Sequence, residues 1–284
     1  VNMSSSRNEA RTNIPTDVPE PQTRAQQGDP LSFAVPTELV DIPSRGKFYP
    51  EEHPLHNVET VEMRFMTAKE EDILTSQSLI KKGIVVDRLL QSLIVDKRIN
   101  LERLLIGDKN ALVVAARISG YGNEYETRVS CPACDSPVDF MFDLDEIDIK
   151  EFEEDEDLMV SLTENNTFRV ELPRSRAIVE VKPLTGADER FITQQGEKRK
   201  KNKLSGNALT TQLKRMICSV NGEDDQGSIS KFVDSLPAFD SRFLRGAYTS
   251  FVPDIDMKQD FTCSECNHEQ TMEVPLTADF FWPR

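Results

Sequence analysis

The chain has 284 residues, a length that supports one large hydrophobic core or two smaller ones. Its 49 acidic and 34 basic residues give a net charge of -15, and because a field of that sign repels phosphate, binding to nucleic acid or to an anionic membrane is disfavoured. No apolar run has the length of a membrane-spanning helix and the first residues lack a signal-peptide core, so we expect a cytosolic protein or part of an assembly built in a cytosol.

Two segments precede the first predicted domain. Residues 1–30 carry almost no large apolar side chains and cannot compensate the entropy of ordering, which predicts a disordered tail. Residues 31–57 contain prolines at 36, 43, 50 and 54 that forbid a helix, which predicts an extended Pro-rich arm. Its apolar side chains must pack either on the chain's own domain or on a neighbouring subunit; they are Ile42, Phe48, Tyr49 and Leu55.

Residues 58–149 predict a first half that combines helices with a hairpin. Thr67 and Glu70 have the spacing of a capping box, at the start of a helical pattern that continues to Gly122. Asp108 is predicted to N-cap a helix that is apolar nearly all round, which indicates a buried central helix. Alternating residues on both sides of the first cysteine motif then predict two strands.

The cysteine pattern organises the rest of the sequence. Two Cys-x-x-Cys motifs each lie between predicted strands, and they contribute Cys131, Cys134, Cys263 and Cys266. A tight turn directs both thiolates of one motif to the same point, and tetrahedral Zn²⁺ needs two such turns. We therefore predict one structural zinc site with four cysteine ligands. Two disulfides or a chance pattern are the alternatives, although a disulfide across Cys-x-x-Cys is usually redox-active; the sequence does not distinguish zinc from iron.

The second half of the chain repeats the pattern of the first. After an acidic linker at 150–166, residues 167–284 predict a strand pair, a helical stretch and a second hairpin. Superposing the two cysteine motifs places Asp108 on Asp240, which is therefore also predicted to N-cap a helix, and Thr185 begins a weaker copy of the first capping box. The predicted fold is therefore α+β, with two related helical-plus-hairpin halves joined by a zinc-ribbon-like site of four cysteines.

Several features allow both a structural and a functional interpretation. The acidic linker is either solvated or a motif for a basic partner, and the basic loop at 198–203 is either a mobile insertion or a nucleic-acid contact. Cys218 lies in an apolar run interpreted as helical, which predicts a buried structural thiol. Three C-terminal aromatic residues either cap the core or dock on another protein; they are Phe280, Phe281 and Trp282.

Catalytic constellations are missing from the sequence. The three histidines are His53 and His56 in the Pro-rich arm, and His268, which is expected to orient the second cysteine turn rather than to bind the metal. A zinc ion with four cysteine ligands has no open position for water, so Lewis-acid catalysis is not expected. Neither a phosphate-binding glycine loop nor a nucleophile elbow occurs. We predict that the protein is not an enzyme and has no small-molecule substrate.

A series of short motifs before the first cysteine pair resembles a known family. The motifs are Phe65–Leu74, Ser78–Gly83, Val95–Asn100, Leu105–Leu112 and Arg117–Gly122. In this order they resemble the baseplate proteins of T-even-type contractile-tailed bacteriophages, specifically the baseplate hub or hub-assembly component. The resemblance is continuous over about 36–144 and looser through 284, and the N-terminal tail does not fit its pattern.

The resemblance implies a non-enzymatic protein that takes part in tail baseplate assembly in the host cytoplasm, either as a virion component or as an assembly factor. The leading hypothesis is a zinc-stapled platform whose partners are other baseplate and tail proteins. The alternatives are a zinc-ribbon nucleic-acid-binding protein that uses the basic loop at 198–203, and a redox sensor that uses the cysteine pairs.

Overall fold

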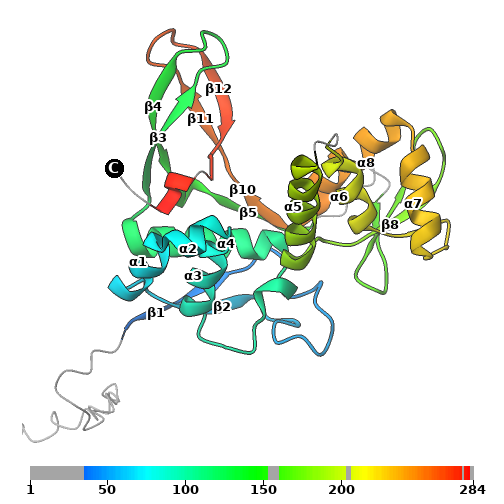
Figure 1. Ribbon diagram of the computed structural model, residues 1–284, viewed down its shortest axis with the longest axis horizontal. Helices are drawn as coiled ribbons and strands as arrows, with labels where there is room; N and C mark the ends of the chain where they lie inside the picture. Colours follow the sequence, from blue (N-terminus) through cyan, green and yellow to red (C-terminus); the bar gives the residue numbers. More distant parts are fainter. Residues whose placement is uncertain (1–34, 153–159, 203–205, 277, 282–284) are drawn as a thin grey trace, which may run out of the picture. The chain divides into compact units, whose positions relative to one another are not determined.

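The computed structural model of the protein describes residues 35–152, 160–202, 206–276 and 278–281. The predicted tail at 1–30 lies outside these residues, as do Trp282 and the centre of the acidic linker. Helices and small antiparallel sheets alternate along the chain, as the α+β prediction requires (Figure 1). Among the described helices, none has both the length and the apolar character needed to cross a membrane.

The first part of the chain places a helical group between a two-stranded sheet and a hairpin. Strands β1 and β2 pair in antiparallel fashion, and so do β3 and β4. The elements are β1 (Thr37–Asp41), β2 (Thr60–Arg64), α1 (Ala68–Thr75), α2 (Gln77–Lys81), α3 (Val85–Leu93), η1 (Leu101–Arg103), α4 (Ile106–Tyr121), β3 (Glu124–Ser130), β4 (Pro137–Asp143), η2 (Leu144–Glu146) and β5 (Asp148–Lys150).

In its described residues, the second part contains a four-stranded antiparallel sheet in the order β6-β7-β8-β9, four α-helices and a second hairpin. Its elements are β6 (Val160–Leu162), β7 (Phe168–Glu171), β8 (Ile178–Val181), α5 (Gly186–Lys201), α6 (Ala208–Met216), β9 (Ile217–Val220), α7 (Gln226–Ser235), α8 (Ala238–Phe251), β10 (Asp254–Asp256), β11 (Lys258–Thr262), β12 (Glu269–Glu273) and η3 (Ala278–Phe281).

Both predicted capping boxes are present. The Glu70 carboxylate accepts a hydrogen bond from the Thr67 main-chain N–H at 3.1 Å, which fixes the start of α1. Asp188 accepts from the Thr185 N–H at 3.1 Å in the same way at the start of α5. The strands around these helices also correspond, because Met63 of β2 bridges Ile94 after α3, and Val181 of β8 pairs with Ile217 after α6.

The predicted N-cap role of Asp108 and Asp240 is wrong. Helix α4 starts at Ile106 and α8 at Ala238, so each aspartate occupies the third helical position. Their carboxylates are fully buried and accept hydrogen bonds from a preceding turn instead. Asp108 binds the main-chain N–H of Ser44 at 2.9 Å and its hydroxyl at 2.6 Å, and Asp240 binds the N–H groups of residues 174 and 175, each at 2.8 Å. The main-chain N–H groups of these turns need an acceptor, and the carboxylates supply it; the turn at Ser44 is buried, whereas residues 174 and 175 are exposed.

The described chain forms two hydrophobic cores, and one of them combines two separate stretches of the sequence. The second core is continuous in sequence and uses apolar side chains between Val160 and Phe251. The first core combines residues from Ile42 to Leu144 with residues from Ile255 to Phe281. Strands β10, β11 and β12 therefore belong with the first core, although they follow the second in sequence.

The Pro-rich arm packs on both hydrophobic cores of the described chain. Ile42, Tyr49 and Leu55 are buried in the first core, and Phe48 is half-buried with its ring centroid 5.2 Å from that of Phe168. Phe280 and Phe281 are likewise buried in the first core, so these two C-terminal aromatic residues cap it. The arm is ordered although its prolines exclude a helix, because its apolar side chains are buried on the chain itself.

His53 is a buried histidine whose environment favours the neutral ring. It is only 4% exposed and stacks on Tyr49, with 4.3 Å between the ring centroids. Its Nδ1 atom accepts a hydrogen bond from the Leu55 N–H at 3.2 Å, so a proton at Nδ1 would place two donors face to face. Burial lowers the pKa of His53 below its ordinary value, and the charge of Arg103 acts in the same direction.

We expect His53 to make the free energy of unfolding fall as the solution is acidified. Its pKa is lower in the folded chain than the unfolded value of about 6.5, so the unfolded chain binds the proton first. The contribution is complete above about pH 6.5 and is lost as pH falls through the folded-state pKa. Urea unfolding at several pH values should show a smaller decrease for His53→Gln than for the wild-type chain. An equal decrease for both would contradict this assignment, and His56→Gln serves as the matched control.

Two further local predictions need correction. Cys218 lies in strand β9 rather than in a helix, because the helical run ends at Met216. The basic cluster is not a loop in its described part, since Lys198 to Lys201 form the last turn of α5. Positive side chains at a helix C-terminus interact favourably with the helix dipole, which gives this cluster a local structural role.

Candidate metal centre

The two cysteine motifs lie at the ends of two hairpins, which stand side by side (Figure 1). In each motif, the N–H of the residue after the second cysteine donates to the carbonyl of the first: Asp135 to Cys131 at 2.8 Å, and Asn267 to Cys263 at 2.9 Å. Both Asp135 and Asn267 adopt positive φ, 55° and 54°, a conformation that short polar residues tolerate. The repeated turn explains why both motifs present their sulfur atoms alike.

All four predicted ligands meet at one point. Their sulfur atoms lie within 4.8 Å of one another, with 3.7 Å between Cys131 and Cys266 and 3.9 Å between Cys134 and Cys263. A zinc ion with bonds of about 2.3 Å to four tetrahedral sulfur atoms requires sulfur–sulfur separations of about 3.8 Å. The cysteines therefore fit a tetrahedral ion. No cysteine of the described chain forms a disulfide, which leaves all four sulfur atoms available as ligands.

The centre is open on one side. Cys131 and Cys263 are completely buried, whereas Cys134 and Cys266 are exposed. The side chain and main chain of Ser136 lower the pKa of the Cys134 thiol to about 6, whereas at Cys266 the main-chain contact with His268 is outweighed by the other cysteine sulfur atoms, which raise the pKa of that thiol. His268 contributes its main-chain oxygen, which accepts the Cys263 N–H at 2.9 Å. The first cysteine of each motif is therefore held by the protein and the second faces solvent.

Sequence patterns did not identify the contacts that join the hairpins below the cysteines. The Gln259 side chain of β11 accepts the Asp143 N–H at 3.1 Å and donates to the Asp143 carbonyl, as another strand would. Phe140 of β4 and Phe261 of β11 pack edge to face, with 5.0 Å between ring centroids. These side chains lie on strands far apart in sequence, so no local spacing rule would pair them.

The sequence matches the family described as T4 bacteriophage base plate protein over residues 37–282. The chain belongs to this family. The match includes both cysteine motifs and both hydrophobic cores, so the family assignment covers the whole described fold. No curated protein and no solved structure matches the chain.

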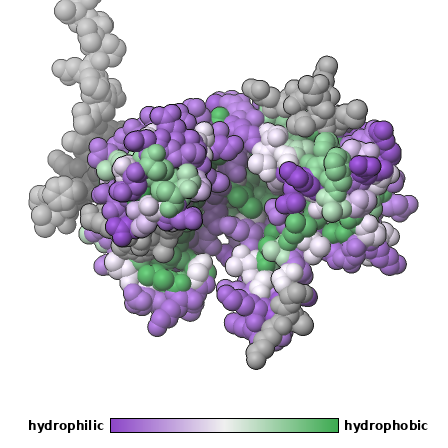
Figure 2. Space-filling view, turned by 90° about the horizontal axis from the view of Figure 1, so that it is seen from above, coloured by the Kyte–Doolittle hydropathy of each residue, from purple (hydrophilic) through white to green (hydrophobic). Residues whose placement is uncertain are grey.

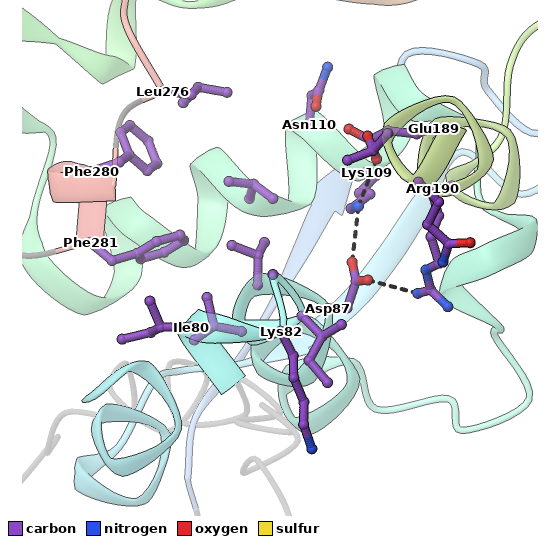
Figure 3. Close-up of a pocket in the computed structure, with 18 of the residues that line it drawn as sticks. Ile80, Lys82, Asp87, Lys109, Asn110, Glu189, Arg190, Leu276, Phe280 and Phe281 are labelled. Carbon is purple, nitrogen blue, oxygen red and sulfur yellow. Dashed lines mark hydrogen bonds and ion pairs between the residues drawn. The ribbon is translucent and has the colours of Figure 1, made fainter. Parts of the chain in front are cut away.

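This base plate family chain also contains a cavity of about 480 Å³ between α2, α3, α4, α5 and the C-terminal segment. Figure 3 shows apolar side chains on one side, among them Ile80, Leu276 and Phe280, and charged side chains on the other. Figure 2 shows a mainly hydrophilic face on which hydrophobic residues gather in a few limited areas. The cavity is a second candidate site, and the described residues of its lining do not include the cysteine cluster.

The charged side of the cavity joins the two parts of the chain. Lys109 of α4 forms ion pairs with Asp87 at 2.9 Å and with Glu189 of α5 at 3.0 Å, and Arg190 pairs with Asp87 at 2.9 Å (Figure 3). Burial opposes the charge of Lys109, but the carboxylates of Glu189 and Asp87 outweigh it and raise the pKa of Lys109. These ion pairs connect α4 to α3 and α5.

Proposed function

We propose that this base plate family chain is a structural or assembly protein of the hub region of a phage tail baseplate, without enzymatic activity. Zn²⁺ bound by Cys131, Cys134, Cys263 and Cys266 would fix the two hairpins, and the resulting platform would bind other baseplate and tail proteins. The observation that carries the metal part is the set of sulfur separations of 3.7 and 3.9 Å, which suit a tetrahedral ion. Four protein ligands leave no position for a substrate or water, which supports a structural role for the ion.

The family membership supports the baseplate part of the proposal, and the Pro-rich arm limits where partners bind. Ile42, Tyr49 and Leu55 are used by the chain's own core, so they are not free to dock on a neighbour. We propose that assembly takes place in the host cytoplasm and that partners contact the exposed outer faces of the hairpins and helices. A net charge of -15 makes a nucleic-acid partner the weaker candidate.

We expect the purified chain to contain one zinc ion and to be recovered from infected cells in complex with other tail proteins. Metal analysis should give about one zinc per chain, and Cys131→Ser should reduce that ratio because a ligand is lost. Cys218→Ser is the matched control, since this thiol lies in β9 and should leave the ratio unchanged.

Cross-linking followed by affinity purification identifies the partners. Recovery of the free monomer alone would contradict the assembly role, and iron in place of zinc would correct the identity of the ion. Retention on DNA or RNA that weakens with salt would instead favour the zinc-ribbon nucleic-acid-binding alternative.

A further inference from the structure

The base of the hairpin pair is held by the protein itself. Strand β5 pairs with β10, with Ile149 opposite Ile255, and this pairing connects the chain just after the first hairpin to the chain just before the second. Helix α4 packs closely on the same point, because a Cβ atom added to Gly107 would lie 2.2 Å from the Pro253 carbonyl oxygen. The side chain of Asn110 in α4 also donates to Asp254 at 3.1 Å. None of these contacts involves a metal ligand.

The middle of the hairpin pair is also joined without a metal. Gln259 forms its two hydrogen bonds with the main chain of Asp143, and it is only 7% exposed. Buried hydrogen bonds of this kind are costly to break, because the polar groups would be left without partners. The ring contact between Phe140 and Phe261 lies farther along the same strands, toward the cysteines.

The outer ends of the hairpin pair, here called the tips, carry the two cysteine turns and differ from the base in the residues that they bury. Around the first turn Pro132, Ala133 and Asp135 are exposed, and around the second Ser264 and Glu265 are exposed. Val129 and Val138, which flank the first turn, are buried, and beyond them few apolar atoms other than those of the cysteines are available to stabilise the outer ends. The four sulfur atoms, which lie within 4.8 Å of one another, are therefore the groups through which one ion would hold the outer ends together.

The order of these contacts determines what the metal stabilises. In small zinc domains the site does not exist before the metal binds, so metal binding and folding are one event. Here the pairing of β5 with β10 already holds the two hairpins together at their base. Most of the conformational entropy that is lost on bringing the two cysteine motifs together is therefore lost when the base forms, before the metal binds.

We infer that the metal orders only the outer ends of the hairpin pair, and that the chain without metal keeps both hydrophobic cores and the base of the pair. The inference rests on the metal centre proposed above. It makes metal occupancy a local control of this surface: the loaded chain presents two fixed tips to a partner, and the metal-free chain presents two separate mobile ones. The exposed Cys134 and Cys266 give a competing chelator direct access to the ion.

Hydrogen exchange measured by mass spectrometry tests this on the full chain, with zinc and after treatment with EDTA. We expect amide exchange to become at least about tenfold faster in residues 130–138 and 262–270, and to stay within about twofold in α4 and in β7–β8. Unfolding of the metal-free chain should remain cooperative. The double variant Cys134→Ser, Cys266→Ser should reproduce the effect of EDTA, and Cys218→Ser should not.

Two results would overturn the inference. Faster exchange throughout α4 and the four-stranded sheet would mean that the metal is needed for the fold, and unchanged exchange at the tips would mean that the ion does not order them.

A second variant separates the base from the tip: Phe261→Ala in the zinc-loaded chain should speed exchange in the middle of β11 while residues 262–270 remain protected. A chain that binds no metal contradicts the proposed function, whereas a chain that binds metal and unfolds throughout on its removal contradicts only this inference.

Discussion

Replacing Asp108 with alanine should lower the free energy of unfolding by about 3 kcal/mol, because it leaves buried donors without an acceptor. The carboxylate accepts from the Ser44 N–H at 2.9 Å, from the Ser44 hydroxyl at 2.6 Å and from the Tyr49 hydroxyl at 2.6 Å. The Tyr49 hydroxyl in turn accepts the N–H of Leu105, the residue that precedes α4, at 3.1 Å. One side chain therefore connects the Pro-rich arm to the start of the central helix. Urea unfolding followed by circular dichroism measures the effect.

Two other aspartates provide matched controls for Asp108. Asp240→Ala removes the acceptor of two main-chain N–H groups and should cost about 2 kcal/mol in the free energy of unfolding. Asp225→Ala removes an exposed N-cap of α7, whose carboxylate accepts the Ser228 N–H, and should cost about 1 kcal/mol. If Asp225→Ala were as destabilising as Asp108→Ala, burial of the donors would not be the cause.

Arg117→Met should lower the free energy of unfolding by about 2 to 4 kcal/mol and release the C-terminal segment. Arg117 is 1% exposed, and its guanidinium donates to three carbonyl oxygens: Phe280 at 2.7 Å, Gly122 at 2.6 Å and Glu124 at 3.0 Å. Methionine fills much of the same space but donates to none of them. Lysine is not an adequate substitute, because a single ammonium group cannot reproduce the planar fork that contacts three carbonyl groups.

Denaturant unfolding and hydrogen exchange together test the role of Arg117. The exchange rate of the η3 amides should increase more than that of the α4 amides, since η3 depends on this contact through Phe280. Arg128→Met is the control: this arginine is exposed and pairs with Asp139 on the hairpin surface, so its loss should leave the free energy of unfolding nearly unchanged. Equal effects for the two arginines would show that the buried contacts are not what stabilises the C-terminal segment.

Local patterns in the sequence were sufficient to predict local structure. Thr67 with Glu70 and Thr185 with Asp188 form their capping boxes because such a box depends on residues three positions apart. The cysteines came together because each pair is fixed by a tight turn, and four such ligands have few alternative partners. The strand pair around residues 168–181 followed from alternation and an intervening turn.

Features that depend on distant contacts could not be predicted in this way. Asp108 has the spacing of an N-cap, but its acceptor role is decided by Ser44 and Tyr49, which lie about sixty positions earlier in the chain. Cys218 is in an apolar run that fits a helix or a strand equally well. The run forms strand β9 because it pairs with β8. The partition of the cores also escaped prediction, because an apolar pattern marks a buried face without indicating which core buries it.

The interrupted first core has a consequence for the chain as it leaves the ribosome. Domains generally fold as units during synthesis, beginning with the N-terminal one, but here the core that begins with Ile42 also needs Phe281. The continuous core between Val160 and Phe251 can close earlier, while the apolar surface of the first is still uncovered. Of the two cores, the one whose first residues are translated earlier is therefore the one that is completed later, and its apolar side chains stay exposed to solvent for longer.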